Sequence, residues 1–250
     1  LLPMAYVRPV YDLFCGMVSL REKLIRNFPQ ASLTLHTRSV LEKVVRDRYP
    51  DCLVNEFPAG LEEIVFINGR TLLNSETVLH KLGKNQSFTI NDKVVAARLS
   101  GAELATVIET VQNGMTIDLD ETAIEKQEID GVLVEYIWDL IQANGDQIRS
   151  DFALATRGSE ESAIDDVTVI HNQNVFIDKT AKIMPQVIID GADGPVFIDR
   201  SAVIQPHVYI QGPVYIGPST LIKAGAKLYS GTSIAEGCKI GGEVNNSIIL

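Results

Sequence analysis

Near neutral pH, histidine and cysteine are the side chains best suited to act as a general base, a nucleophile or a soft metal ligand. The sequence has four histidines and three cysteines. Cys15, Cys52 and Cys238 share no spacing typical of a metal site, and an odd number of thiols cannot all pair. We therefore expect reduced thiols in a cytoplasmic protein.

None of the four histidines has the sequence context that base catalysis requires. His36, His80 and His171 have no motif around them. His207 occupies a position of the repeat described below, and we expect it to face solvent or a neighbouring subunit. Because a histidine without a hydrogen-bonded partner is rarely catalytic, we predict no general base among the four.

The charge balance limits the classes of partner. The chain has 22 Lys and Arg against 32 Asp and Glu, a formal net charge of -10. An acidic surface repels phosphate polymers, which argues against nucleic-acid binding, but a few local basic residues can still hold a small phosphorylated substrate. No apolar run approaches the ~20 residues that span a bilayer, so we expect no membrane span.

A strict six-residue repeat dominates the last third of the chain. Every sixth residue is a large aliphatic one: Ile198, Ile204, Ile210, Ile216, Ile222, Leu228, Ile234 and Ile240. Four residues after each comes a small or β-branched one: Ala202, Val208, Val214, Thr220, Ala226, Thr232, Cys238 and Val244. The same spacing begins at Ile177, before a three-residue insertion within residues 191–195.

This period predicts a left-handed parallel β-helix built of hexapeptide repeats. Strands have a side-chain period of two and helices of 3.6, so neither alone gives a period of six. A coil with three short faces does, since each face points one large aliphatic residue inward before a tight corner. At Asn246 the rule fails, so we expect a loop or register change there. We expect Tyr209, Tyr215, Ala224 and Ala226 on exposed coil faces.

The pattern of apolar residues from residue 1 to about 155 predicts a separate α/β domain. Short apolar runs predict strands at residues 33–35, 64–67 and 94–97, and helical spacing predicts helices at residues 39–48, 100–112 and 132–148. This alternation favours a doubly wound sheet. The polar stretch 156–162 is the expected linker, which divides the chain into residues 1–160 and 161–250.

The order of an α/β domain and then a hexapeptide β-helix resembles the domain order of the bacterial bifunctional UDP-N-acetylglucosamine pyrophosphorylase/glucosamine-1-phosphate N-acetyltransferases. The chain looks like a short, divergent branch of that family. Residues 2–10, Gly16 and residues 21–25 resemble the family's Leu-x-Pro-Leu-Thr-x-x-x-Pro-Lys stretch and the helix after it. Residues 66–70 resemble its strand ending in Asn-Gly-Asp, and residues 136–140 match the same branch.

The resemblance implies a nucleotidyltransferase-like, Rossmann-like domain followed by an acyltransferase-like β-helix. We expect the first to be truncated at its N-terminus, because the family's glycine-rich phosphate loop should precede Leu1. We expect the second to be truncated at its C-terminus, since the chain ends inside an apolar run. The family's general-base histidine should then lie beyond Leu250.

In the family, a sugar 1-phosphate attacks the α-phosphate of a nucleoside triphosphate with the help of cations and Mg²⁺. The resemblance implies that Arg8, Lys23, Asn68, Gly69 and Arg70 bind nucleotide or sugar phosphate. Two positions depart from the pattern, because Val10 replaces the family's lysine and Arg70 its magnesium aspartate.

These departures leave several interpretations open. The domain could bind metal elsewhere, Arg70 could contact phosphate directly, or catalysis could be lost. For Arg8, Arg21 and Lys23 the alternative to a phosphate role is a solvated helix face or salt bridges.

For the β-helix the resemblance implies acetyl transfer from acetyl-coenzyme A in a homotrimer, with sites between neighbouring helices. Lys223 stands where the family has a sugar-phosphate arginine, and Asn245 where it has a lysine, so both are implied to bind the acyl acceptor.

Three hypotheses follow, in this order. The first is a nucleotidyltransferase and acetyltransferase that makes nucleotide sugars such as UDP-N-acetylglucosamine for cell-envelope synthesis. The second is an acyltransferase whose first domain only binds a sugar nucleotide, an interpretation that Arg70 favours. The third is a non-catalytic trimeric regulatory scaffold.

Overall fold

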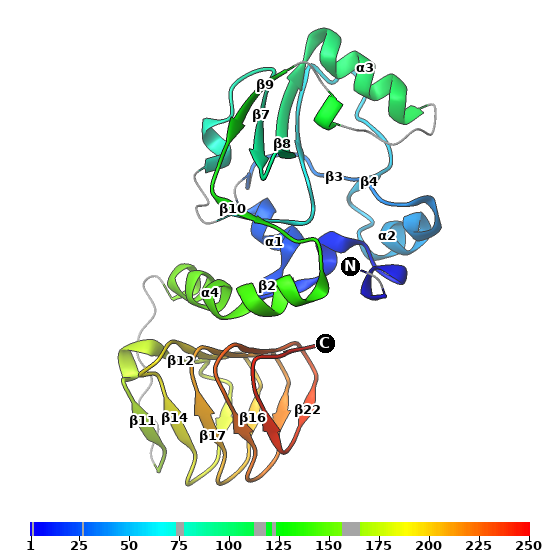
Figure 1. The fold of residues 1–250 in the computed structure, drawn as a ribbon. Coiled ribbons are helices and arrows are strands. Elements are labelled where there is room, and N and C mark those ends of the chain that lie inside the picture. The colour runs from blue at the N-terminus through cyan, green and yellow to red at the C-terminus, as the bar shows by residue number, and fades with distance from the viewer. Residues whose placement is uncertain (2, 27, 74–77, 113–118, 122–123, 157–165) are drawn as a thin grey trace. The chain divides into compact units, whose positions relative to one another are not determined.

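The computed structural model describes residues 1, 3–26, 28–73, 78–112, 119–121, 124–156 and 166–250 (Figure 1). They form two compact units, one of Leu1–Leu13 with Leu20–Glu135 and the other of Phe14–Ser19 with Tyr136–Leu250. The greater part of the expected linker, from residue 157 on, lies outside the described residues, as does Leu2.

The first unit begins with a series of short elements, the last of which form a βαβ arrangement. In chain order they are η1 (Met4–Tyr6), η2 (Val10–Asp12), α1 (Leu20–Ile25), β3 (Thr34–Leu35), η3 (Ser39–Leu41), α2 (Glu42–Arg48) and β4 (Leu53–Val54). Strands β3 and β4 pair in parallel, with α2 as the crossover between them. Leu35, Leu41, Val45 and Val54 are buried in one cluster with Tyr11, which holds the helix against the two strands.

A mixed four-stranded sheet completes this unit, in the order β5-β8-β7-β9. Its strands are β5 (Glu63–Ile67), β7 (Gln86–Ile90), β8 (Lys93–Ser100) and β9 (Glu125–Glu128). Strand β8 is antiparallel to both neighbours, whereas β7 and β9 are parallel. Helix α3 (Gly101–Gln112) packs Leu104 and Val107 against Ala97 and Leu99. The strands expected at residues 64–67 and 94–97 and the helix at 100–112 are confirmed.

The helix expected over residues 132–148 begins later than predicted. Val132 lies in β10 (Gly131–Leu133), which pairs antiparallel with β6 (Thr71–Leu73). Helix α4 (Ile137–Ala155) starts only after Tyr136, whose backbone N–H donates to Asp139 Oδ2 at 2.8 Å. The apolar run was therefore a strand followed by a capped helix. The unit also contains η4 (Val78–Lys81) and η5 (Leu119–Glu121).

The second unit contains the β-helix that the repeat predicted, wound as three stacks of parallel strands (Figure 1). The first stack is β11 (Thr168–Ile170), β14 (Ile188–Asp190), β17 (Tyr209–Gln211), β20 (Lys227–Leu228) and β23 (Glu243–Val244). The second is β12 (Val175–Ile177), β15 (Val196–Ile198), β18 (Val214–Ile216), β21 (Thr232–Ile234) and β24 (Ile248–Ile249). The third is β13 (Lys182–Ile183), β16 (Val203–Ile204), β19 (Leu221–Ile222) and β22 (Lys239–Ile240). A short turn, η6 (Asn172–Asn174), precedes β12.

The expected aliphatic columns form the core of the coil. Of the eight large aliphatic positions from Ile198 to Ile240, all but the last are fully buried, and Ile240 is 8 % exposed. The register change comes earlier than the expected Asn246. Lys227 pairs with Glu243 and Leu228 with Val244, so the corner after Ile240 is two residues shorter than the others. Gly242, at φ +80°, makes this tight corner possible.

Helix α4 and the hairpin of β1 (Phe14–Cys15) and β2 (Val18–Ser19) cover the outer face of the second stack. Ile148 and Met17 pack there against Phe197 and Tyr215. Tyr215 is therefore 6 % exposed, contrary to its expected place on a free face. Ala226 is also buried, because it turns inward at a corner of the coil. No helix among the described residues is long and apolar enough to cross a membrane.

Candidate functional site

Residues 5–11 cross the ends of two strands of the first unit. The Arg38 side chain, just after β3, donates a hydrogen bond to the Ala5 carbonyl. Tyr11 packs against Gly69, just after β5, so closely that a Cβ on Gly69 would lie 2.8 Å from Tyr11 Cβ. Ligands of open α/β sheets bind outside the carboxyl ends of the strands. We therefore take this carboxyl edge, formed by residues 5–11, 36–38 and 68–70, as the candidate site.

The turn of residues 68–70 is fixed from both sides. The Asn68 N–H donates to the Val95 carbonyl at 2.8 Å, and the Val134 N–H donates to the Arg70 carbonyl at 2.9 Å. Asn68 Oδ1 accepts from Arg70 N at 3.1 Å and from Arg70 Nε at 3.4 Å. The side chain of Asn68 thus orients the guanidinium of Arg70, which is half-buried.

Three arginines belong to the segments that meet at the carboxyl edge. Arg8 is half-buried in the bend between η1 and η2, and Arg38 is exposed. With Arg70 they provide permanent positive charge and forked donors that match phosphate oxygens. The sequence analysis named Arg8 and Arg70 but missed Arg38. The available signal for Arg38 was its position three residues after a predicted strand.

Arg21 belongs to an ion cluster around the buried carboxylate of Asp12. Its Nε lies 3.3 Å from Asp12 Oδ1, and its guanidinium lies 4.3 Å from the centroid of the Tyr49 ring. Asp12 also accepts from Arg48 at 3.2 Å and from the Tyr49 hydroxyl at 2.8 Å. The salt-bridge interpretation of Arg21 is therefore confirmed. Lys23, half-buried on the same helix, has a contact within the chain, and its phosphate role stays a prediction.

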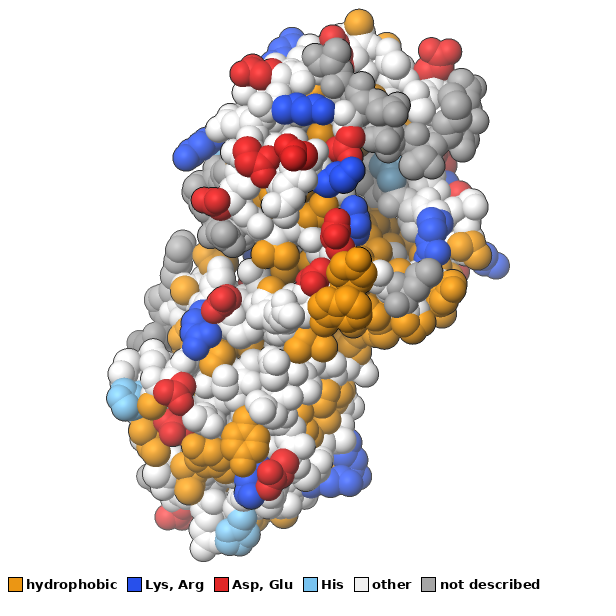
Figure 2. Space-filling model, in the orientation of Figure 1, with side chains coloured by type: hydrophobic (Ala, Val, Ile, Leu, Met, Phe, Trp, Pro, Cys, Tyr) orange, Lys and Arg blue, Asp and Glu red, His pale blue; other side chains and the backbone are white. Residues whose placement is uncertain are grey.

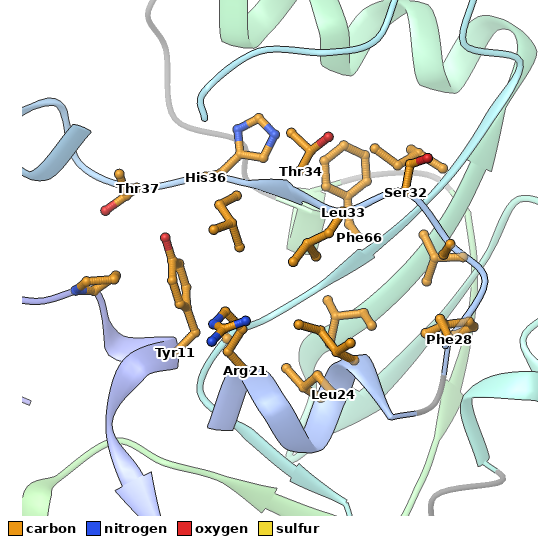
Figure 3. A pocket seen from close by; sticks show the side chains of 18 of the residues that line it. Tyr11, Arg21, Leu24, Phe28, Ser32, Leu33, Thr34, His36, Thr37 and Phe66 are labelled. Carbon is orange, nitrogen blue, oxygen red and sulfur yellow. The ribbon is translucent and has the colours of Figure 1, made fainter. Parts of the chain in front are cut away.

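A cavity of about 710 Å³ extends from the carboxyl edge into the unit, lined mainly by apolar residues of α1, β3 and β5. Figure 3 shows Tyr11 and Thr37 at one end and Phe28 and Ser32 at the other. An apolar lining is unsuited to phosphate, so the phosphate chemistry belongs to the edge and not to the interior.

Two buried polar atoms face this cavity without a hydrogen bond of normal geometry among the described residues. They are the Tyr11 hydroxyl and His36 Nε2. Burial raises the pKa of Tyr11 above its ordinary value, and Asp12 adds to the shift, whereas the nearby Thr37 side chain opposes it. Burial lowers the pKa of His36. Near neutral pH both side chains are therefore uncharged.

The turn does not fit the magnesium ion that the resemblance implies. Asn68 Oδ1 is already occupied by two donors of Arg70, whose guanidinium would repel a cation. Within the described ranges, no group of three or more His, Cys, Asp or Glu side chains could hold a metal ion. We therefore assign no residue of the turn to magnesium.

The two residues predicted for the β-helix lie apart within one chain. Lys223 is exposed at the corner before β20, where its stem packs on Gly241 of the next coil. Asn245 is exposed just after β23. Because β20 and β23 are parallel neighbours, the two side chains flank opposite ends of the same face. Their binding role stays a prediction.

The surface charge agrees with the composition. On the face drawn in Figure 2, acidic and basic side chains are interspersed. Several of these charges form exposed pairs, such as Lys227 with Glu243 at 2.6 Å and Arg98 with Glu63 at 2.7 Å. Exposed pairs of this kind contribute little to stability.

Comparison with known proteins gives one family match. A family model described as sugar nucleotidyl transferase matches residues 1–160. These residues include the whole first unit, the β1–β2 hairpin and helix α4. A search of curated proteins found no match.

Proposed function

Because the chain belongs to the sugar nucleotidyl transferase family and is a transferase, we propose that its carboxyl edge binds the phosphates of a nucleoside triphosphate and a sugar 1-phosphate. The observation that carries this proposal is the convergence of three arginine-bearing segments at residues 5–11. Arg38 is bonded to Ala5 there, and the turn that holds Arg70 packs on Tyr11.

The reaction needs positioning and neutralisation of charge more than covalent help from the protein. A phosphate oxygen of the sugar 1-phosphate attacks the α-phosphorus of the nucleotide. The bond from that phosphorus to the oxygen that bridges to the β-phosphate breaks, and pyrophosphate leaves with the electron pair. In our proposal Arg8, Arg38 and Arg70 hold the phosphates, and Asn68 keeps the Arg70 guanidinium in place.

We further propose that the product is a UDP-sugar of the N-acetylglucosamine type and that the β-helix transfers an acetyl group from acetyl-coenzyme A. The stacked coil supports the second part, because it provides flat outer faces for association into a trimer. The alternative, an acyltransferase whose first unit only binds sugar nucleotide, rests on Arg70 in place of a magnesium ligand.

The test is a direct assay of nucleotidyl transfer. The full-length protein is incubated with UTP, MgCl₂ and N-acetylglucosamine 1-phosphate or glucose 1-phosphate, and pyrophosphate release is measured. The reverse reaction is followed from UDP-N-acetylglucosamine and pyrophosphate. Turnover in both directions supports the proposal. Acetyl transfer to glucosamine 1-phosphate without any nucleotidyl transfer would establish the alternative instead.

A further inference from the structure

The segment of residues 5–11 brings Arg8 to the carboxyl edge, and its backbone is attached on both sides of that arginine. On one side the Ala5 carbonyl accepts a hydrogen bond from Arg38. On the other side Tyr11 is buried in the core of the unit. Arg8 itself is half-buried and forms no hydrogen bond or ion pair with another described residue. The backbone of the segment therefore determines where this guanidinium lies.

The residue that follows the segment, Asp12, is bonded to α1 and to the end of α2. Its side chain is only 4 % exposed. Oδ1 accepts from the Tyr49 hydroxyl at 2.8 Å and from Arg21 Nε at 3.3 Å, and Oδ2 accepts from Arg48 Nη1 at 3.2 Å. Arg21 belongs to α1, Arg48 is the last residue of α2, and Tyr49 follows it. Three donors from different directions fix both the position and the orientation of the carboxylate.

A single helical turn, η2, connects this carboxylate to Arg8. The Asp12 N–H donates to the Pro9 carbonyl at 3.1 Å, and the Leu13 N–H donates to the Val10 carbonyl at 3.0 Å. Pro9 has φ -66°, the value at which its ring holds the backbone. The residue before a proline is restricted too, because the proline ring disfavours the helical region for it. The direction in which Arg8 leaves the backbone is therefore set from Asp12 through one turn and one proline.

The make-up of the Asp12 cluster suits positioning more than stability. Taking a carboxylate and two guanidinium groups out of water costs free energy that offsets much of their mutual attraction. The side chain of Arg48 is 50 % exposed, and ion pairs in contact with water contribute little. An apolar side chain could fill the space of Asp12, but it would have no preferred direction toward α1 and α2. Direction is what the carboxylate adds.

We propose that Asp12 is a positioning residue for nucleotidyl transfer, which holds η2, and through η2 the guanidinium of Arg8, where the phosphates bind. This role rests on the proposed function of the carboxyl edge. Asp12 acts on the phosphates only through Arg8, because its own carboxylate is buried and faces the two helices. A displacement of about 1 Å in a group that positions a substrate can lower a rate by about 100-fold.

A double-mutant cycle tests whether Asp12 acts through Arg8. Asparagine keeps the shape of Asp12, but it loses the charge and turns an N–H group toward one of the three donors. We expect Asp12→Asn in the full-length protein to lower kcat/KM for nucleotidyl transfer about 10-fold. In the Arg8→Ala background the same change should lower it by less than about twofold. Equal losses in the two backgrounds would overturn the proposal, because Asp12 would then act independently of Arg8.

Glu42→Gln is the control for the loss of a carboxylate from an ion pair of the same unit. Glu42 pairs with Arg46 on α2, away from residues 5–11, so kcat/KM should stay within about twofold of the unmodified value. A loss as large as that of Asp12→Asn would mean that any such carboxylate has this effect, and it would contradict a specific role for Asp12.

Amide hydrogen exchange measures the hold on η2 without an assay of activity. In Asp12→Asn we expect the amides of residues 12 and 13, which close η2, to exchange at least about 10-fold faster. The amides of Asn68 and Val134, which are hydrogen-bonded elsewhere in the unit, should change by less than about twofold. Equal acceleration of all four amides would overturn the proposal, because Asp12 would then only stabilise the unit.

The two readouts separate this proposal from the proposed function. Absence of nucleotidyl transfer in the unmodified protein would overturn the proposed function and the role of Asp12 in it. Activity in the unmodified protein, together with unchanged exchange of the η2 amides in Asp12→Asn, would overturn the role of Asp12 alone.

Discussion

Arginine at position 70 changes the chemistry that its turn can perform. A guanidinium cannot ligate magnesium, but it can donate two hydrogen bonds to phosphate, and Asn68 holds it in place. We expect Arg70→Ala to lower kcat/KM for nucleotidyl transfer by about 10- to 100-fold, the range expected when charge-assisted hydrogen bonds are lost.

Arg46→Ala is the control for the removal of a guanidinium from the same unit. Arg46 pairs with Glu42 and Glu56 on the exposed side of α2, so its loss should leave kcat/KM within about twofold of the unmodified value.

Arg70→Asp separates the two interpretations of the turn, a phosphate-binding arginine and a lost magnesium ligand. A gain in magnesium-dependent rate in that variant would mean that Arg70 had replaced a metal ligand without taking on a phosphate role.

His36 predicts a pH dependence of stability. Burial lowers its pKa in the folded protein, so the unfolded chain binds a proton more readily. The free energy of unfolding should therefore decrease as the pH falls below about 6.5, the ordinary histidine value. Urea unfolding at pH 7.5 and 5.5 measures the effect. His36→Leu should lose part of this dependence, whereas exposed His207→Asn should keep it; equal dependence in both variants would contradict the prediction.

At the scale of elements, a buried polar network fastens α4 and the β1–β2 hairpin to the coil. Asn144 Oδ1 accepts from the Gly16 N–H at 2.7 Å and from Ser233 Oγ at 3.1 Å. Its Nδ2 donates to the Gly231 carbonyl at 2.7 Å. Ser233 Oγ also lies 2.6 Å from the Gly16 carbonyl. Gly16 itself has φ +76°, and a Cβ there would lie 2.4 Å from Asp151 Oδ2.

Replacing Asn144 with leucine keeps the volume but leaves the buried Gly16 N–H and Gly231 carbonyl without their hydrogen-bond partner, whereas Ser233 Oγ can still donate to the Gly16 carbonyl. We expect Asn144→Leu to lower the free energy of unfolding by about 2–4 kcal/mol, the cost of several buried hydrogen bonds. Gln142→Leu, on the exposed side of the same helix, is the matched control and should change stability by less than about 0.5 kcal/mol. Equal urea midpoints for the two variants would argue against the network.

Sequence periodicity predicts those elements that pack against a nearby stretch of the chain with the same residue pattern. The aliphatic columns could be predicted because each coil packs on a copy of the same pattern. The Asn144 network could not, because its partners lie 89 and 128 residues away and carry no motif. The lining of the cavity and the position of Arg38 likewise depend on which strands become neighbours, and short runs of apolar residues do not specify that. At Val132 the apolar spacing predicted a helix, but Val132 pairs with Leu72 of β6 and lies in a strand, and a partner 60 residues away leaves no mark on local spacing.

At the scale of the whole molecule, the proposed acetyl transfer depends on assembly. Lys223 and Asn245 flank opposite ends of one coil face, so they do not converge within a single chain. If both bind the same acceptor, they must come from neighbouring subunits of a trimer. The exposed Ile170 and Ile188 on this face, at 39 % and 38 %, are consistent with a surface that is covered in the assembly.

Hybrid trimers test this arrangement. Lys223→Ala and Asn245→Ala should each abolish acetyl transfer to glucosamine 1-phosphate in the full-length protein. In trimers co-expressed from both variants, about a quarter of the sites would unite an intact Lys223 with an intact Asn245, because each comes from a different subunit. We therefore expect co-expression to restore activity that separate expression and late mixing do not. If the hybrid is as inactive as the single variants, the two residues act within one chain, and the site must be sought on a single coil.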